Sequence, residues 1–169
     1  MSISTDRPGN PKRVPIERLN KLFMQQSVPE SKIGAKDNIM DANILLLVSN
    51  HNRIGVRTFL EQAGLVVTSA NDFRDAQRLL RGITCDLVLV EVEISDGSWQ
   101  DLLEFILDAK IACEMIVCSR LGDERLWAEV IQSGAYNLIV EPYGQREFLR
   151  IVQGALDERQ MQRMIRARQ

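Results

Sequence analysis

The sequence is poor in the residues from which metal and redox sites are usually built. It contains one histidine, His51, and three cysteines, Cys85, Cys113 and Cys118, none of them in a C-x-x-C pair. A structural zinc site needs four such ligands at close spacing, and a disulfide framework needs an even number of cysteines. We therefore expect no metal site, three reduced and mostly buried thiols, and a solvated loop position for His51.

Long apolar runs and a signal peptide are also missing. No apolar stretch approaches the roughly 18 residues of a membrane span, and the first dozen residues are too polar for a signal peptide. Residues 42–156 contain 10 basic and 16 acidic side chains, and an acidic surface does not suit nucleic acid. These features predict a cytoplasmic protein that contacts neither a membrane nor nucleic acid directly.

Five short apolar runs alternate with amphipathic segments from residue 43 onward. The segments between the runs carry helix-capping residues and terminal glycines, and the runs themselves are predicted strands at 43–48, 65–69, 86–92, 115–118 and 136–140. This alternation is typical of an α/β fold with a parallel sheet covered on both faces. We expect a flavodoxin-like, doubly wound sheet of five strands in the order 2-1-3-4-5.

The segments on either side of this unit have a different character. Residues 1–41 are rich in proline, serine and charge, and they are predicted to form a flexible arm with one short amphipathic helix, whose apolar face is Ile16, Leu19, Leu22 and Phe23. The last helix is predicted to begin near Gln145 and to continue to about Arg168. We therefore divide the chain into the arm, a domain at 42–158 and a basic helical extension at 159–169.

Polar side chains follow the carboxyl ends of four predicted strands. Ser49 and Asn50 follow the first strand, and Glu91 lies near the end of the third. Ser119 ends the fourth strand and Glu141 follows the fifth. Because these strand ends meet over one cleft in this topology, we expect the five side chains to be delivered there.

The sequence resembles the receiver domains of two-component response regulators over about residues 42–158. The resemblance rests on five segments in the family's order, namely LLLV with a polar pair after it, Gly64 after the first helix, DLVLVEVEISDGS, VCSR, and SGAYNLIVEPYGQREFL, in which Pro142 follows the fifth strand. It implies the fold predicted above, a signalling role that is not enzymatic, and protein partners such as a kinase, a regulator or an effector.

The positions that carry phosphotransfer in this family hold different residues here. By resemblance, Ser49 and Asn50 replace an acidic pair that helps to hold Mg²⁺, Glu91 replaces the acceptor aspartate, and Glu141 replaces a lysine. Ser119 keeps the family's hydroxyl. Neutral groups bind Mg²⁺ weakly, and a carboxylate repels a phosphoryl group. We predict a stand-alone pseudo-receiver without Mg²⁺ or another cofactor, which acts through protein–protein contact without conventional aspartyl phosphorylation.

Several alternatives stay open. A flavodoxin-like module that binds a small ligand or nucleotide is one, although SNHNRIG lacks a Gly-rich phosphate loop. A conventional phosphorelay receiver with unusual site residues is another. Glu91 either imitates a phosphorylated aspartate or is a polar remnant that pairs with Arg120 or a neighbouring hydroxyl. Ser119 is either a switch hydroxyl or a cap for the next turn.

Apolar side chains in excess of the core mark candidate contact surfaces. Trp127, on the fourth predicted helix, and Tyr136, on the fifth strand, are expected beside one surface. A narrow stripe on the C-terminal extension consists of Met161, Met164 and Ile165. These residues predict either a protein partner or a homodimer formed through helix four, strand five, helix five or the C-terminal helix.

Overall fold

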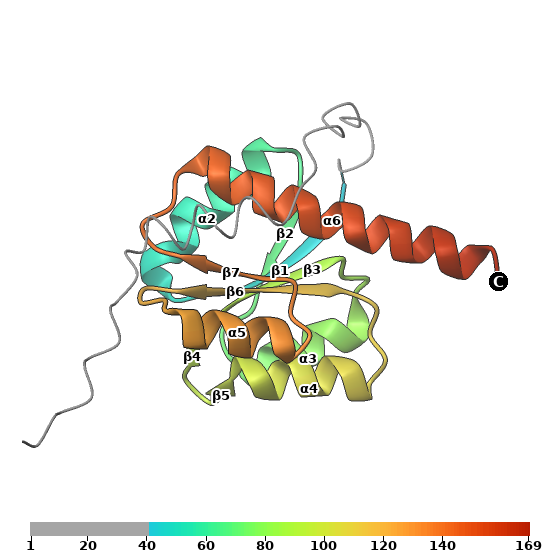
Figure 1. Cartoon of the computed structure of the whole chain (residues 1–169), viewed down its shortest axis with the longest axis horizontal. Coiled ribbons are helices and arrows are strands. Elements are labelled where there is room, and N and C mark those ends of the chain that lie inside the picture. The colour runs from blue at the N-terminus through green and yellow to red at the C-terminus, as the bar shows by residue number, and fades with distance from the viewer. Residues whose placement is uncertain (1–40) are drawn as a thin grey trace, which may run out of the picture.

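The computed structural model describes residues 41–169, and the amphipathic segment around residues 16–23 lies outside them. Five parallel strands form one sheet in the order β2-β1-β3-β6-β7 (Figure 1). Their bounds are β1 Asn43–Leu47, β2 Val66–Ser69, β3 Leu87–Glu91, β6 Glu114–Ser119 and β7 Asn137–Val140. The predicted strand order and the flavodoxin-like α/β fold are confirmed.

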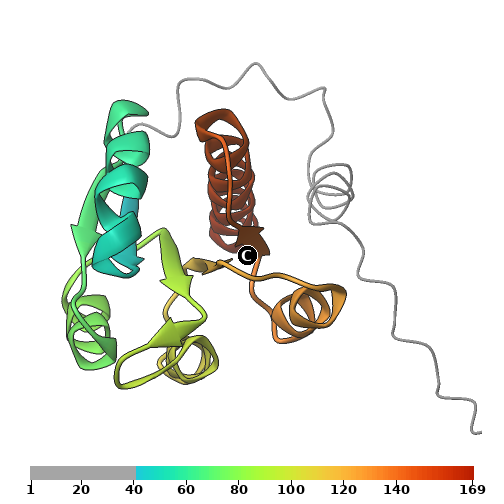
Figure 2. The same cartoon turned by 90° about the vertical axis from the view of Figure 1, so that its left-hand side faces the viewer.

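Helices cover both faces of the sheet. Within the described residues they are α2 Asn50–Gln62, α3 Phe73–Gly82, α4 Trp99–Asp108, α5 Glu124–Gln132 and α6 Gln145–Ala167. Helices α2 and α6 lie on one face, and α3, α4 and α5 lie on the other (Figures 1 and 2). Successive strand side chains point to opposite faces, so Leu45 and Val88 pack beneath one helical layer while Ile44 and Leu87 pack beneath the other. Burial on both faces explains why the strands are almost continuously apolar.

Local side-chain bonds set the starts of three helices. Asp72 and Asp123 cap α3 and α5 by accepting backbone N–H groups, each over 2.8 Å. Ser98 and Asp101 form a capping box at the start of α4. These caps satisfy N–H groups that have no partner within the helix. The helix-capping residues expected between the apolar runs are therefore present at the starts of α3, α4 and α5.

The turn after β3 contains a short hairpin that the sequence prediction missed. Strands β4, Glu93–Ile94, and β5, Gly97–Ser98, pair in antiparallel register. The carboxylate of Asp96, at the tip, accepts the backbone N–H groups of Phe73 over 2.7 Å and Arg74 over 3.3 Å. The hairpin is thereby tied to the start of α3. A strand of two residues leaves too short a pattern to be detected in the sequence.

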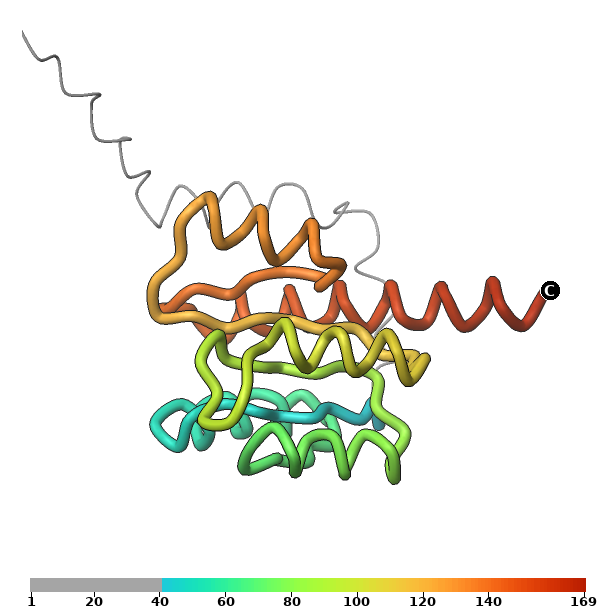
Figure 3. The backbone as a smooth tube through the Cα atoms, turned by 90° about the horizontal axis from the view of Figure 1, so that it is seen from below, coloured from blue at the N-terminus to red at the C-terminus, as the bar shows by residue number. Residues whose placement is uncertain are grey.

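Helix α6 continues past the sheet, as the sequence predicted, and Figure 3 shows its last turns beyond the other elements. Its first half packs on α2 and the sheet through Phe148, Val152, Ala155 and Leu156. The helix runs without interruption across the proposed boundary at residues 158 and 159, and that boundary stays a prediction. None of the helices in the described region has both the length and the hydropathy of a membrane span.

Candidate functional site

The carboxylate of Glu91 lies at the end of β3 and is held by the element that follows β1. The hydroxyl of Ser49 donates a hydrogen bond to Glu91 Oε1 over 2.9 Å. Ser49 is the residue before α2, where a serine side chain often caps the helix. Here its hydroxyl makes no such cap and bonds to the Glu91 carboxylate instead. Of the two pairings predicted for a polar remnant, Arg120 or a neighbouring hydroxyl, the structure contains the hydroxyl.

Asn52 connects two carboxylates that are 50 residues apart in the sequence. Its amide Nδ2 donates to Glu91 Oε1 over 3.3 Å and also donates to Glu141 Oε1. The prediction had placed Asn50 in this cleft, but Asn50 is exposed at the first position of α2. Asn52 was missed, although a spacing of three residues from Ser49 puts both side chains on one side of a helix start. Ser49, Asn52, Glu91 and Glu141 are called the amide-bridged cleft below.

The two carboxylates of the amide-bridged cleft are compensated by neutral donors. In the described region the ion pairs lie elsewhere, namely Arg57 with Glu61, Arg78 with Asp75, and Arg163 with Asp86. The nearby Arg53 guanidinium donates to the backbone carbonyls of Val48 and Ala70, each over 3.2 Å. The cleft therefore carries concentrated negative charge that a serine hydroxyl and an asparagine amide stabilise.

Two groups packed beside this cleft, Cys118 and Tyr143, have raised pKa values. Burial, reinforced by Glu91 and Glu141, raises the pKa of the Cys118 thiol to about 12. Burial, reinforced by Cys118 and the same two carboxylates, raises the pKa of the Tyr143 hydroxyl above its ordinary range. Tyr143 is stacked on Phe148, with 5.2 Å between ring centroids. Both groups stay protonated at neutral pH, which avoids adding further negative charge.

Ser119 lies at the end of β6, where its hydroxyl closes a turn. It donates to the carbonyl of Leu121 over 2.6 Å and accepts the N–H of Leu121 over 3.2 Å. This is the arrangement expected of a cap for the turn. Gly122 follows, and a Cβ atom there would collide with the side chain of Val140, so the loop fits against β7 only with glycine.

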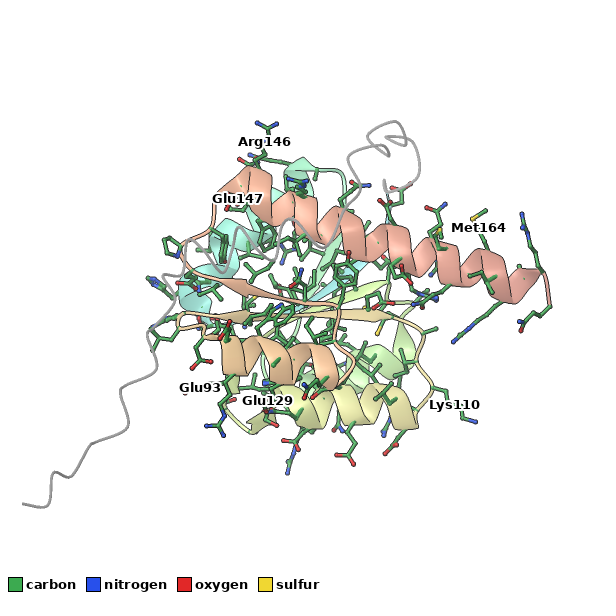
Figure 4. The ribbon with its side chains drawn as sticks, viewed as in Figure 1. Glu93, Lys110, Glu129, Arg146, Glu147 and Met164 are labelled. Atoms are coloured by element: carbon green, nitrogen blue, oxygen red, sulfur yellow. The ribbon has the colours of Figure 1, made fainter. Side chains whose placement is uncertain are left out.

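The residues that were proposed as contact surfaces do not form one patch. Trp127 is half-buried and packs with the cluster under α3, α4 and α5, whereas Tyr136 packs with the cluster under α2 and α6. The expectation that they lie beside the same surface is wrong, because Tyr136 precedes β7 and faces the other helical layer. On the α6 extension, Met161, Met164 and Ile165 are 47%, 54% and 57% exposed, and Met164 projects away from the body (Figure 4).

Comparison with known proteins identifies the scaffold. The sequence model of the response regulator receiver domain matches residues 47–153, well over half of the chain. The chain belongs to the response regulator receiver domain family. It is therefore a receiver domain of two-component signalling, a class whose members are generally signalling domains that work with protein partners and are not enzymes.

The relatives and solved structures agree with this family. Protein CcdB of Bacillus subtilis is 27% identical over 101 residues, covering 59% of this chain and 84% of its own. Chemotaxis protein CheY of Thermotoga maritima is 25% identical over 92 residues, covering 54% and 77%. The structure of NtrX from Brucella abortus, in complex with ADP, has a TM-score of 0.72 at 20% identity, covering 77% of this chain and 30% of that one. A receiver domain from Methanospirillum hungatei has a TM-score of 0.65 at 17% identity, covering 73% and 98%.

Receiver domains usually use Mg²⁺, so the donor groups of the cleft are compared here with those that this ion needs. The described residues bring together no group of three or more histidine, cysteine or carboxylate side chains suited to a metal ion. Two carboxylates are present, but the Asn52 nitrogen that lies between them is a hydrogen-bond donor and so cannot be a ligand. Mg²⁺ requires oxygen ligands in near-octahedral geometry. The amide-bridged cleft, as folded, does not fit a magnesium site.

Proposed function

We propose that this receiver domain transmits signals through protein–protein contact and does not use the conventional aspartyl-phosphate cycle. The observation that supports this most strongly is the Asn52 amide, which joins Glu91 at the acceptor position to Glu141 at the lysine position. A neutral amide thus stabilises the two carboxylates at positions where the family uses a metal ion and a lysine. The cleft is complete without an added phosphoryl group.

Electrostatics argue against a phosphoryl group at Glu91. Two unit charges about 4 Å apart interact by about 4 kcal/mol at an effective dielectric of about 20. Replacing an attractive lysine by the repulsive Glu141 therefore disfavours the phosphorylated state by up to about twice that amount, before screening by water. Without a cation on the entering oxygens, the transfer itself also loses its main source of charge stabilisation.

The hydrogen bonds of Glu91 also help to choose between its two interpretations, a mimic of phosphoaspartate and a polar remnant. A carboxylate that imitates phosphoaspartate has to present its charge to a switch residue, but Glu91 accepts from Ser49 and Asn52, while the Ser119 hydroxyl bonds to Leu121. This arrangement favours a structural role for Glu91. A Glu91→Gln variant keeps its acceptor oxygen, so we expect unchanged affinity for a protein partner, and a large loss would support the phosphate mimic.

We infer that the domain passes its signal to a partner through its outer surfaces. Trp127, Tyr136 and the exposed stripe of the α6 extension stay the candidate contacts for a kinase, regulator or effector, or for a second copy of the chain. Residues 42–156 contain 16 acidic and 10 basic side chains, and an excess of negative charge does not suit nucleic acid. Removal of residues 158–169, with mass measured by light scattering, tests the homodimer, because an unchanged dimeric mass would exclude the extension as its seam.

The proposed function is tested by incubation with a small phosphodonor and Mg²⁺, followed by intact-mass measurement. We expect no stable adduct of about 80 Da, the mass of one phosphoryl group, under conditions that fully modify a conventional receiver treated in parallel. A stable adduct on the wild-type chain that disappears in Glu91→Ala would overturn the proposal. It would favour the conventional receiver with unusual site residues.

A further inference from the structure

Two cysteines lie together at the opposite edge of the sheet from the amide-bridged cleft. Cys85 precedes β3 and Cys113 precedes β6, and these strands are neighbours in the sheet. Both side chains pack with the same apolar cluster, Cys85 buried and Cys113 partly exposed. Each thiol shifts the pKa of the other, because Cys113 lowers the pKa of Cys85 and Cys85 raises the pKa of Cys113. The third cysteine, Cys118, belongs to the cluster on the other face.

The backbone geometry of this pair is compatible with a disulfide. Continued beyond the starts of both strands, the register that pairs Leu87 with Glu114 would place Cys85 one residue out of step with Cys113. Neighbouring strands lie about 4.8 Å apart and rise about 3.3 Å per residue, so such an offset gives a Cα–Cα separation of about 6 Å. Disulfides span Cα atoms about 4.4–6.8 Å apart.

Each cysteine is followed by an acidic residue that anchors the C-terminal extension. Asp86, after Cys85, pairs with Arg163 and accepts the Asn43 N–H over 2.9 Å. Glu114, after Cys113, accepts a hydrogen bond from Gln162 over 2.9 Å. Beside them, the Arg159 side chain is buried and its Nε has no partner in the described region. Thus the first turn of the extension is held by the two residues next to the thiols.

We propose that Cys85 and Cys113 form an oxidisable dithiol, which a small peroxide closes to a disulfide that loosens the attachment of the α6 extension. The Cys85 thiolate attacks one peroxide oxygen, breaking the O–O bond, to give a sulfenic acid and hydroxide, which takes up a proton to become water. The Cys113 sulfur then displaces the sulfenic hydroxyl and loses its own proton, which releases a second water. Two thiols are oxidised and one peroxide is reduced to two waters. The neighbouring Cys113 lowers the pKa of Cys85, which favours the reactive thiolate.

The link to the helix follows from the connectivity of the chain. Asp86 and Glu114 are the residues next to Cys85 and Cys113, so the rearrangement of the two cysteines that closes the disulfide is passed on to them. Because these two acids hold Arg163 and Gln162, their displacement weakens both bonds at once. The exposed stripe at the end of α6 is then presented on a less constrained helix.

The test uses the full chain, treated with dilute hydrogen peroxide and then alkylated with N-ethylmaleimide in denaturant. We expect a mass loss of about 2 Da before alkylation, one alkylated cysteine in place of three, and a cross-linked Cys85–Cys113 peptide after digestion. Cys118→Ala is the matched control and should still form the disulfide. Cys113→Ala should not, and it reports any methionine oxidation that peroxide causes independently of the disulfide. Alkylation of all three cysteines in the treated wild type would overturn the proposal.

Limited trypsin digestion measures the attachment of the extension. Cleavage after Arg159 and Arg163 should become several-fold faster in the oxidised wild type and stay unchanged in peroxide-treated Cys113→Ala. Restoration of slow cleavage by a reductant supports the proposal. A disulfide that forms without any change in the cleavage rate would overturn the link to α6.

Discussion

The amide bridge in the cleft can be tested by removing it. Asn52→Ala deletes the donor that Glu91 and Glu141 share. A hydrogen bond to a charged group is worth roughly 1.5–3 kcal/mol, and the partial exposure of these side chains reduces that value. We expect Asn52→Ala to lower the free energy of unfolding by about 2 kcal/mol, or the melting temperature by about 4–8 °C. Urea or thermal unfolding measures it directly.

The matched control for this substitution is Asn50→Ala. Asn50 lies in the same first turn of α2 and is exposed, so both changes give the same gain in helix propensity. The difference between the two variants isolates the bridge. If Asn52→Ala is no less stable than Asn50→Ala, the bridge contributes nothing and the reasoning fails.

A double-mutant cycle tests the electrostatic part of the argument. Glu91 and Glu141 both reach one nitrogen, so their oxygens lie within about 6 Å, where like charges repel by about 3 kcal/mol at an effective dielectric of about 20, less solvent screening. Glu141→Gln removes this repulsion. Asn52→Ala should therefore cost at least about 1 kcal/mol less in the Glu141→Gln background, whereas equal costs within about 0.5 kcal/mol would refute coupling between the carboxylates.

Three further predictions concern other parts of the fold. Gly122→Ala should destabilise the domain by about 1–3 kcal/mol through overpacking, whereas Gly55→Ala, which meets no neighbour within 4 Å, should stabilise α2 by up to about 1 kcal/mol; equal urea midpoints would contradict this. Arg163→Ala leaves the buried Asp86 with one backbone donor and should cost about 1–3 kcal/mol, with faster hydrogen exchange in the last turns of α6; unchanged exchange would contradict the anchor. The Cys118 pKa of about 12 lies above the ordinary thiol value, so the folded state keeps a proton that the unfolded chain loses, and the free energy of unfolding should fall as pH rises from about 9 to 12, with a shallower slope in Cys118→Ala.

The sequence was sufficient for the fold because its signals are local. The apolar strands, the caps Asp72, Ser98 and Asp123, and the start of α6 at Gln145 were all recognisable within a few residues of chain. Once five strands and their connecting helices are placed, few arrangements of a right-handed doubly wound sheet remain. The strand order followed from those restrictions.

The details that the sequence did not reveal depend on contacts between distant residues. The bond between Arg163 and Asp86 joins residues 77 positions apart, and no local pattern distinguishes Arg163 from the other arginines of the extension. Asn52 is similar, because its role depends on Glu141 coming within reach across the cleft. Strand order predicted which loops meet, but the side chain that reaches across depends on the helix rotation that packing selects.

The separation between core and cleft explains how a receiver fold can keep its architecture with a changed site. The stability of the sheet comes from strand side chains such as Leu89 and Ile116, which are fully buried, while the phosphotransfer positions lie at strand ends and contribute little apolar burial. Charge at those positions can therefore change without loss of the fold, provided that buried or half-buried carboxylates find donors. Ser49 and Asn52 supply those donors to Glu91. Membership of the family thus predicts the scaffold. The donors around Glu91 support the proposal that this domain carries its signal by binding alone.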